Sequence, residues 1–325
     1  MQYATALFAV QLLAAIGTVN FNTRYLRKEK RFPTFVVIVF FTMKAQLSLL
    51  RPKHIVKNIL VLLPLIFSGK LLVLPLLVRT LIAVVIFSLL ASVIYIVNDL
   101  LDAPMDRLHP SKKNRPIASG AVSETAAKAE AAIVLILLIA LSVLISLPYL
   151  AWMTLLAYLV INLAYSLGLK NVPILDIALL ASGFLLRVFF GSAVTGIAIS
   201  GWLYLTVLAV SFYLGLGKRR NELSCQSDKS RKVLSYYTYE FLDKNLQLFM
   251  VLAVVFYSLW ALDDGNPSSH MLWTVPLLLC LCLKYSLDIE GDSDGDPIEV
   301  IFRDKALLLL GMAFAALTFI LLYCL

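Results

Sequence analysis

The chain has 325 residues, of which 61% are hydrophobic and only 15% are charged, and its mean hydropathy is +0.88. A soluble domain of this length does not have such a composition, so we predict an all-α protein that crosses a membrane several times. The net charge of +8 comes largely from basic residues in alternate loops, which membrane topology explains, so we expect no nucleic-acid partner.

Two apolar stretches precede the main series. Residues 4–19 are apolar, and five basic residues follow them between positions 24 and 31. A cleaved signal peptide carries its positive charge before the apolar stretch, so we predict an additional span or anchor here. Residues 34–50 are interrupted by Lys44 and Gln46. Because a crossing there would place the basic residues of 51–57 on the wrong side, we predict an interfacial helix.

Nine apolar runs follow, most of them near the ~20 residues that a bilayer requires. They predict nine spanning helices, at residues 55–70, 79–97, 125–146, 149–167, 174–195, 201–217, 245–262, 271–287 and 305–325. The first run is short and contains Pro64, which predicts a kink.

The loops between these runs differ in charge. Basic residues gather at 107–115, 170, 218–244 and 303–305, whereas the other set of loops carries little beyond Lys70 and Arg79. Positive loops stay on the cytoplasmic side of a membrane. We therefore predict a multi-pass protein of the inner (plasma) membrane, with these basic loops in the cytoplasm.

An acidic motif, running from Asn98 to Asp106, ends the second apolar run on the predicted cytoplasmic side. On a helix, Asp99, Asp102 and Asp106 are spaced i, i+3 and i+7 and project from one face. Such like charges repel unless a cation neutralises them, and an oxygen-only ligand set suits Mg²⁺ shared with a diphosphate. The alternative is an acidic helix end that is exposed to water and balanced by the basic residues after it.

Further polar clusters lie at the same predicted ends of the helices. Lys53 and Lys57 are four residues apart and are expected to share one face of the first helix. Arg187 lies well inside an apolar run and needs a buried anionic partner or a polar cavity, and a structural pair with Asp176 is the alternative to a functional role. The basic residues 218–220 are either phosphate ligands or topology signals.

These clusters together favour a substrate with a diphosphate leaving group, and the membrane setting favours a lipid as the second substrate. The sequence contains no nucleotide-binding P-loop and no dinucleotide fingerprint. The acidic loop at 288–296 does not match an EF-hand, because the sixth and twelfth positions counted from Asp292 are Pro297 and Arg303.

The acidic motif resembles the first signature of the UbiA-type prenyltransferase superfamily, whose members are bundles of nine membrane helices. The resemblance implies that Asn98, Asp99, Asp102 and Asp106 bind Mg²⁺ and a diphosphate, with the three aspartates as the catalytic set. Members usually carry a second Asp-rich motif, but the corresponding region here keeps one carboxylate, Asp176. We accordingly predict an N-terminal extension at 1–47 and a UbiA-like transmembrane catalytic domain at 48–325.

Five other segments resemble one branch of that superfamily, the decaprenyl-phosphate phosphoribosyltransferases. They are residues 51–58, 114–120, 217–223, 237–243 and 296–300. This resemblance implies transfer of 5-phosphoribosyl from phosphoribosyl pyrophosphate to a polyprenyl phosphate, with release of pyrophosphate. The residues that it implies as contacts of the two substrates are Lys53, Lys57, Asn58, Arg115, Tyr165, Lys170, Asp176, Arg187, Lys218, Arg219 and Arg220.

Two other functions stay open at this point. A prenyltransferase with an aromatic acceptor would share the fold and the metal, although a single carboxylate stands where a second Asp pair belongs. A transporter of a phosphorylated solute would also use charges inside the membrane. The sequence leaves open whether the protein forms a homo-oligomer.

Overall fold

The computed structural model describes residues 45–109, 112–224, 232–263, 270–290 and 297–324, apart from the side chains of Lys53, Pro297 and Ile298. Within these residues every regular element is a helix, which confirms the predicted all-α fold class. The predicted span at 4–19, most of the predicted interfacial helix and most of the acidic loop lie outside the described residues.

The α-helices are α3 (Leu63–Phe67), α4 (Leu74–Asp106), α5 (Glu124–Leu144), α6 (Tyr149–Leu167), α7 (Leu175–Thr195), α8 (Gly201–Ser224), α9 (Tyr239–Ala261), α10 (Val275–Glu290), α11 (Pro297–Arg303) and α12 (Lys305–Tyr323). The 3₁₀ helices are η2 (Pro52–Leu62), η3 (Lys112–Asn114), η4 (Leu169–Asn171), η6 (Lys232–Tyr236) and η7 (Met271–Thr274). In the described part of the chain, eight helices are long and apolar enough to cross a membrane, and a shorter apolar helix covers His54–Phe67. These nine correspond in order to the nine predicted runs.

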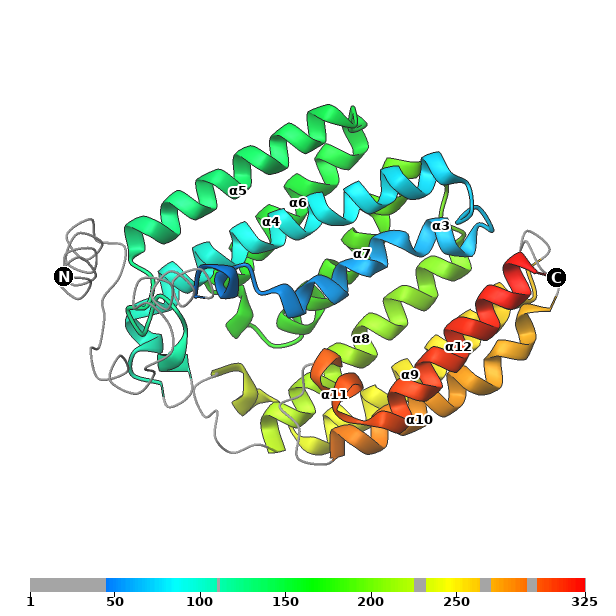
Figure 1. Ribbon diagram of the computed structural model, residues 1–325. Helices are drawn as coiled ribbons and strands as arrows, with labels where there is room; N and C mark the ends of the chain where they lie inside the picture. Colours follow the sequence, from blue (N-terminus) through cyan, green and yellow to red (C-terminus); the bar gives the residue numbers. More distant parts are fainter. Residues whose placement is uncertain (1–44, 110–111, 225–231, 264–269, 291–296, 325) are drawn as a thin grey trace, which may run out of the picture. The chain divides into compact units, whose positions relative to one another are not determined.

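The described residues form two compact units, and the first contains residues 45–55 and 85–145. Unit 1 thus includes the later part of α4 and all of α5, which are drawn in cyan and green in Figure 1. Its core joins Leu49, Ile96, Ile117 and Ala127 from segments far apart in the sequence. The α5 helix begins after Ser123, whose hydroxyl oxygen accepts a hydrogen bond from a main-chain N–H of the first turn.

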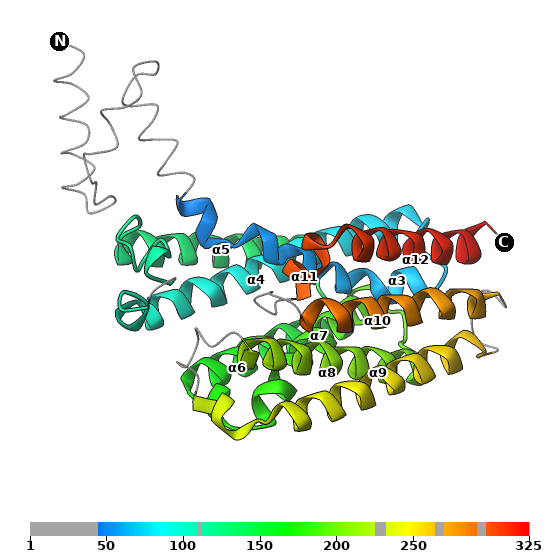
Figure 2. The same ribbon diagram turned by 90° about the horizontal axis from the view of Figure 1, so that it is seen from below.

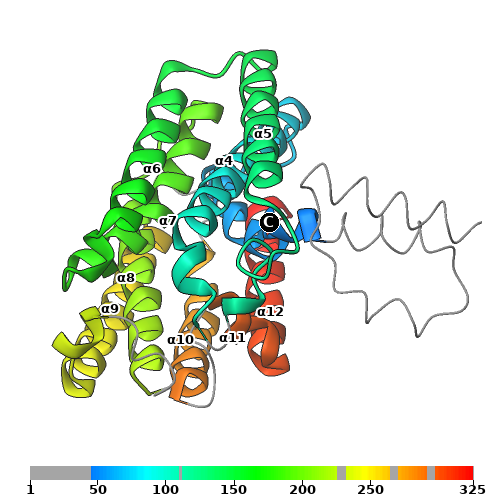
Figure 3. The same cartoon turned by 90° about the vertical axis from the view of Figure 1, so that its left-hand side faces the viewer.

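Unit 2 contains the described parts of 56–84 and 146–325. Within it α8 packs between α7 and α9, α6 packs on α7, and α10 packs on α12. Figures 1 and 2 show these helices side by side, and Figure 3 shows α7, α8 and α9 following one another from a third direction. Most of them expose a wide apolar face, as membrane-spanning helices do.

A glycine allows the close approach of η2 to α7. A Cβ atom added to Gly191 would lie 1.9 Å from the carbonyl oxygen of Val61, which no real Cβ atom tolerates. The two backbones therefore touch at this point, and a side chain at position 191 would force them apart.

The first apolar run differs from the helix that we predicted. The 3₁₀ helix η2 begins at Pro52, before the run, and covers the run as far as Leu62, and Pro64 stands in the first turn of α3, where the helix type changes. In a 3₁₀ helix with three residues per turn, positions i and i+3 share a face, whereas positions i and i+4 point about 120° apart. The side chain of Lys53 lies outside the described residues, so the shared cationic face of Lys53 and Lys57 stays a prediction.

Three helices extend six or more residues beyond the apolar runs that predicted them. The α4 helix continues through the whole acidic motif, α8 continues through residues 218–224, and α9 begins six residues before its run. A prediction based on hydropathy alone places the end of a helix where charged residues begin. These charged residues instead have partners within the fold, described below, and so stay helical.

Candidate functional site

The predicted site residues lie on several elements. The acidic motif is on α4, Lys53, Lys57 and Asn58 are on η2, Arg115 follows η3, and Tyr165 is near the end of α6. Lys170 is on η4, Asp176 and Arg187 are on α7, and residues 218–220 are on α8. The contacts gather them into four groups, one in unit 1 and three in unit 2.

The group in unit 1 joins two buried aspartates of α4 to two arginines. Arg51 Nη2 lies 2.6 Å from Asp99 Oδ1, and Arg115 Nη1 lies 3.2 Å from the same oxygen. Arg115 Nη1 also lies 2.7 Å from Asp106 Oδ2. Asp99 and Asp106 are two helical turns apart, so both project from one face as predicted. The side chain of Asp102 is half-buried on the same helix.

This arrangement fits a hard divalent cation. A single nitrogen, Arg115 Nη1, lies within hydrogen-bonding distance of both carboxylates, so a positive charge is already held between Asp99 and Asp106. The neighbouring Asn98 Oδ1 is buried and accepts no hydrogen bond from the described residues. The side chains of Asp99, Asp106 and Asn98 would offer a cation only oxygen atoms, the ligand type that Mg²⁺ prefers. Among the described residues, however, no three His, Cys, Asp or Glu side chains already converge as a metal-binding set.

Arg51 was absent from the predicted substrate contacts, and its backbone is unusual. Its φ of 48° lies in the left-handed region, which costs a non-glycine residue on the order of 1–3 kcal/mol. The guanidinium carbon lies 4.7 Å from the centroid of the Tyr95 ring, one turn before Asp99 on α4. The position of Arg51 at the start of a segment that resembles a family motif was the sequence signal for it.

A second group surrounds Arg187, deep in α7. Its Nε donates to Asn58 Oδ1 at 2.8 Å, its Nη2 to the Tyr158 hydroxyl at 2.9 Å, and its Nη1 to the Gly183 carbonyl at 2.6 Å. The guanidinium carbon also lies 5.1 Å from the centroid of the Tyr158 ring. The structure therefore brings together two predicted site residues that are 129 positions apart, Asn58 and Arg187. Tyr158 was absent from the predicted site residues, because it belongs to none of the motifs in the sequence.

The suggested structural pair between Arg187 and Asp176 was wrong. The two residues are eleven positions apart on one α-helix, which separates them by about 16 Å along its axis. Asp176 pairs instead with Arg219 of α8, whose Nε lies 2.5 Å from Asp176 Oδ2.

The ion pair at the centre of this third group is fully buried. The side chains of Asp176 and Arg219 both have 0% exposure. Arg219 Nη1 pairs with Glu222 at 2.5 Å, and Arg219 Nη2 donates to the Tyr165 hydroxyl at 3.3 Å. With no exposed surface, the pair supports a structural role that joins α7 to α8, and a ligand reaches neither side chain in this arrangement.

Tyr237 completes the third group. Its hydroxyl donates to Asp176 Oδ1 at 2.5 Å and accepts from the Ile174 N–H at 2.6 Å. Ile174 has a φ of 67°, which is strained for a β-branched residue, so this hydrogen bond holds the start of α7 in place. Burial, together with the hydrogen bond to Asp176, raises the pKa of the Tyr237 phenol, so the hydroxyl keeps its proton.

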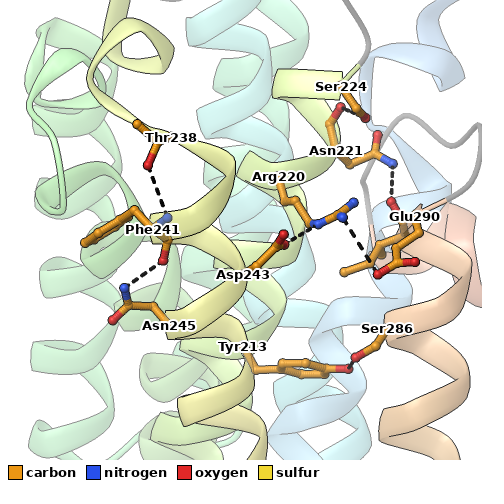
Figure 4. A network of polar contacts seen from close by, with 11 residues as sticks. Tyr213, Arg220, Asn221, Ser224, Thr238, Phe241, Asp243, Asn245, Ser286 and Glu290 are labelled. Carbon is orange, nitrogen blue, oxygen red and sulfur yellow. Dashed lines mark hydrogen bonds and ion pairs between the residues drawn. The ribbon is translucent and has the colours of Figure 1, made fainter.

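The fourth group, shown in Figure 4, involves Arg220. Its Nε lies 2.5 Å from Asp243 Oδ1 of α9, and its Nη2 lies 3.7 Å from Glu290 Oε1 of α10. Beside it, Asn221 donates to the Ile289 carbonyl at 3.2 Å. Arg220 thus joins the ends of three helices, while its neighbour Lys218 is half-buried on the same helix.

Lys57 and Lys170 are half-buried as well, and the side chain of Lys53 is outside the described residues. Direct contact of these lysines with a substrate stays a prediction.

Comparison with known proteins agrees with this fold and with the motifs. The model of the UbiA prenyltransferase family matches residues 59–302. The decaprenyl-phosphate phosphoribosyltransferase of Mycobacterium tuberculosis is 34% identical over 275 residues, which are 82% of this chain and 90% of that protein. The protein of the same name from Corynebacterium glutamicum is 34% identical over 274 residues, covering 81% and 82% of the two chains.

A solved structure shares the fold. It is a UbiA homolog from Archaeoglobus fulgidus bound to GPP and Mg²⁺, with a TM-score of 0.64 and 18% identity, covering 86% of this chain and 99% of that one. The family match covers most of the sequence, and relatives above 30% identity span four fifths of it. This chain is therefore a multi-pass membrane enzyme that belongs to the UbiA prenyltransferase family.

Proposed function

We propose that this protein transfers 5-phosphoribosyl from phosphoribosyl pyrophosphate to a polyprenyl phosphate of the decaprenyl type, and releases pyrophosphate. The observation that carries the proposal is the 34% identity, over 82% of the chain, to a relative named decaprenyl-phosphate phosphoribosyltransferase. The charged group of Asp99, Asp106, Arg51 and Arg115 agrees with it, because a diphosphate leaving group needs both a metal site and cationic hydrogen-bond donors.

The reaction exchanges one bond at C1 of the ribose for another. The bond from C1 to the diphosphate oxygen breaks and its electron pair leaves with the diphosphate, while an oxygen of the lipid phosphate bonds to C1. The carbon develops oxocarbenium character, as it does in glycoside cleavage. In-line attack inverts C1 and yields a β-linked phosphoribosyl lipid.

The protein does not need a strong general base for this reaction. The second pKa of a phosphate monoester is about 6, so the lipid phosphate is largely ionised near neutral pH. What the reaction needs is stabilisation of the charge on the departing diphosphate. Arg51 and Arg115 can supply this with charge-assisted hydrogen bonds, since a guanidinium matches phosphate oxygens in two-pronged geometry.

Asp99 and Asp106 would hold Mg²⁺, with Asn98 and Asp102 as additional oxygen donors. When bound, the cation neutralises charge on the leaving diphosphate. The cationic residues of unit 2 that remain candidates for binding phosphate groups are Lys57, Lys170, Arg187 and Lys218. The basic loops support placing the acidic motif at the cytoplasmic face of the plasma membrane, where a soluble sugar phosphate is available.

Mass spectrometry of the lipid product tests the proposal. Purified protein in detergent is incubated with Mg²⁺, phosphoribosyl pyrophosphate and decaprenyl phosphate, and the expected product is the lipid phosphate plus one phosphoribosyl group. A parallel reaction contains a prenyl diphosphate and an aromatic acceptor. Product in the second reaction alone would establish an aromatic prenyltransferase, and absence of a covalent product from both would favour transport.

A further inference from the structure

Two arginines already pair with a carboxylate, Asp99, that a divalent cation would need. Arg51 Nη2 and Arg115 Nη1 both bond Asp99 Oδ1, at 2.6 and 3.2 Å, and Arg115 also bonds Asp106. The two positive and two negative charges of this group balance. Asp99 is only 3% exposed, so its carboxylate interacts strongly with charges beside it.

A cation that binds Asp99 must therefore compete with the two guanidinium groups. Without another anion, the arginines that it displaces would lose their bonds to Asp99 and face a divalent charge of the same sign. A diphosphate removes both penalties, because its oxygens accept hydrogen bonds from guanidinium groups at least as well as a carboxylate does.

We propose that Arg51 is a ligand-exchange residue. It holds Asp99 until a diphosphate and its divalent cation arrive together, and it then turns its hydrogen bonds from Asp99 to a phosphate oxygen. This inference rests on the proposed function and extends it, because it assigns a substrate contact to a residue outside the acidic motif and makes cation and diphosphate bind cooperatively.

Arg51 suits this exchange better than Arg115 does. Among the described residues it pairs with one carboxylate, whereas Arg115 bridges two. Its side chain is 24% exposed, similar to the 29% of Arg115, so a ligand can reach it, and the single pairing is what distinguishes it. The Tyr95 ring, 4.7 Å from the guanidinium carbon, gives the cation a second contact that persists while its hydrogen bonds change partner.

Binding of Mn²⁺ to the purified full chain, measured by electron paramagnetic resonance with and without inorganic pyrophosphate, tests the exchange. In the unchanged protein, pyrophosphate should tighten Mn²⁺ binding by about 5- to 150-fold, the usual range of coupling between two sites. In Arg51→Gln, Mn²⁺ alone should bind more tightly, on the order of tenfold, because a competing positive charge is gone. Pyrophosphate should bind that variant more weakly, and its effect on Mn²⁺ should shrink.

Arg107→Gln is the matched control, since Arg107 follows the acidic motif directly and forms an exposed pair with Glu124 at 3.6 Å. It removes the same charge and should leave both affinities unchanged. Arg115→Gln provides a second variant should Arg51→Gln fail to fold, and it should also tighten binding of Mn²⁺ alone.

Opposite changes in the two affinities separate exchange from a purely structural role, which would weaken both together. Mn²⁺ binding that is unchanged or weaker in both arginine variants overturns the exchange and leaves the proposed reaction standing. If the unchanged protein binds no Mn²⁺ even with pyrophosphate, the metal assignment of the proposed function fails along with the exchange.

Discussion

Asp99 accepts hydrogen bonds from two arginines, and this makes it the most informative single position for mutation. Asp99→Asn keeps the shape of the side chain but removes the charge that a divalent cation requires. We expect turnover to fall by at least about 100-fold, with the protein still folded and inserted. Product formation by mass spectrometry, after chelation and restoration of Mg²⁺, measures the loss.

Glu124→Gln is the control for Asp99→Asn, because Glu124 is an exposed carboxylate of the same unit at the start of α5. It should leave turnover unchanged. Full activity in Asp99→Asn would reject the metal site.

The lysines of η2, η4 and α8 test the identity of the donor. Phosphoribosyl pyrophosphate carries a 5-phosphate that a prenyl diphosphate lacks, so its binding requires additional cations. Loss of one charge-assisted phosphate contact costs about 1.5–3 kcal/mol, or roughly ten- to a hundredfold in affinity. Among Lys57→Ala, Lys170→Ala and Lys218→Ala, at least one should raise the KM for the sugar donor far more than the KM for the lipid. Normal donor KM values in all three variants would count against the proposed donor.

Arg219 and Arg220 are neighbours with different surroundings, which makes a stability comparison direct. Arg219 forms a fully buried pair with Asp176, whereas the partner of Arg220, Asp243, is 42% exposed. Removing one partner of a buried pair leaves an uncompensated charge and costs about 3–5 kcal/mol. Removing Arg220, which is 16% exposed, leaves a carboxylate that water can reach, so the cost is lower, about 1 kcal/mol.

We therefore expect Arg219→Met to lower the thermal unfolding temperature in detergent much more than Arg220→Met does. Equal shifts in the two variants would contradict the structural role that the buried pair supports.

At the scale of elements, the contact between η2 and α7 depends on Gly191, which has no side chain. Gly191→Ala places a Cβ atom against the Val61 carbonyl and should destabilise the protein by about 1–3 kcal/mol, since one backbone must move. Gly311→Ala in α12 is the control, because a Cβ atom there meets nothing within 4 Å. That control should be neutral or stabilise by up to about 1 kcal/mol through its helix propensity.

The thermal unfolding temperatures of the two glycine variants in detergent test this prediction. A Gly191→Ala protein as stable as the Gly311→Ala protein would show that η2 and α7 do not approach as the structure has them.

Charged residues at helix ends explain why elements are longer than their apolar runs. The α8 helix continues past position 217 because Arg219 and Arg220 have carboxylate partners on α7, α9 and α10. A charged residue also stabilises the start of α12. Asp304 Oδ1 accepts a hydrogen bond from the Leu307 N–H at 2.8 Å, and Asp304 Oδ2 pairs with Lys284 of α10 at 2.7 Å. Such partners come from other helices, so hydropathy along one segment cannot reveal them.

At the scale of the whole molecule, the charge of the loops predicts orientation in the membrane. Lys244, near the start of α9, belongs to the basic set, and Lys70, before α4, belongs to the other set. Both side chains are exposed. In a cysteine-free background, an impermeant thiol reagent added to intact cells should label Lys70→Cys but not Lys244→Cys. The reverse pattern would place the acidic motif on the outer face, away from a cytosolic donor.

The sequence by itself determined the fold class, the order of the apolar helices in the described part of the chain and the family. Each of these depends on local quantities, because a bilayer demands about 20 apolar residues per helix and the i, i+3, i+7 spacing places the aspartates of α4 on one face. Several motifs at fixed positions then pointed to one branch of the family. The N-terminal extension at 1–47 and the direct contacts of the lysines stay predictions.

Only the tertiary structure decided which charges meet. Arg51 and Asp99 are 48 positions apart, Arg219 and Asp176 are 43 apart, and Arg187 and Asn58 are 129 apart. Spacing within one helix ruled out the pair that we had suggested for Arg187, but it could not supply the true partner. The physical reason is that a charge buried in a membrane protein needs a counter-charge or hydrogen bonds, and packing between helices distant in the sequence determines which groups provide them.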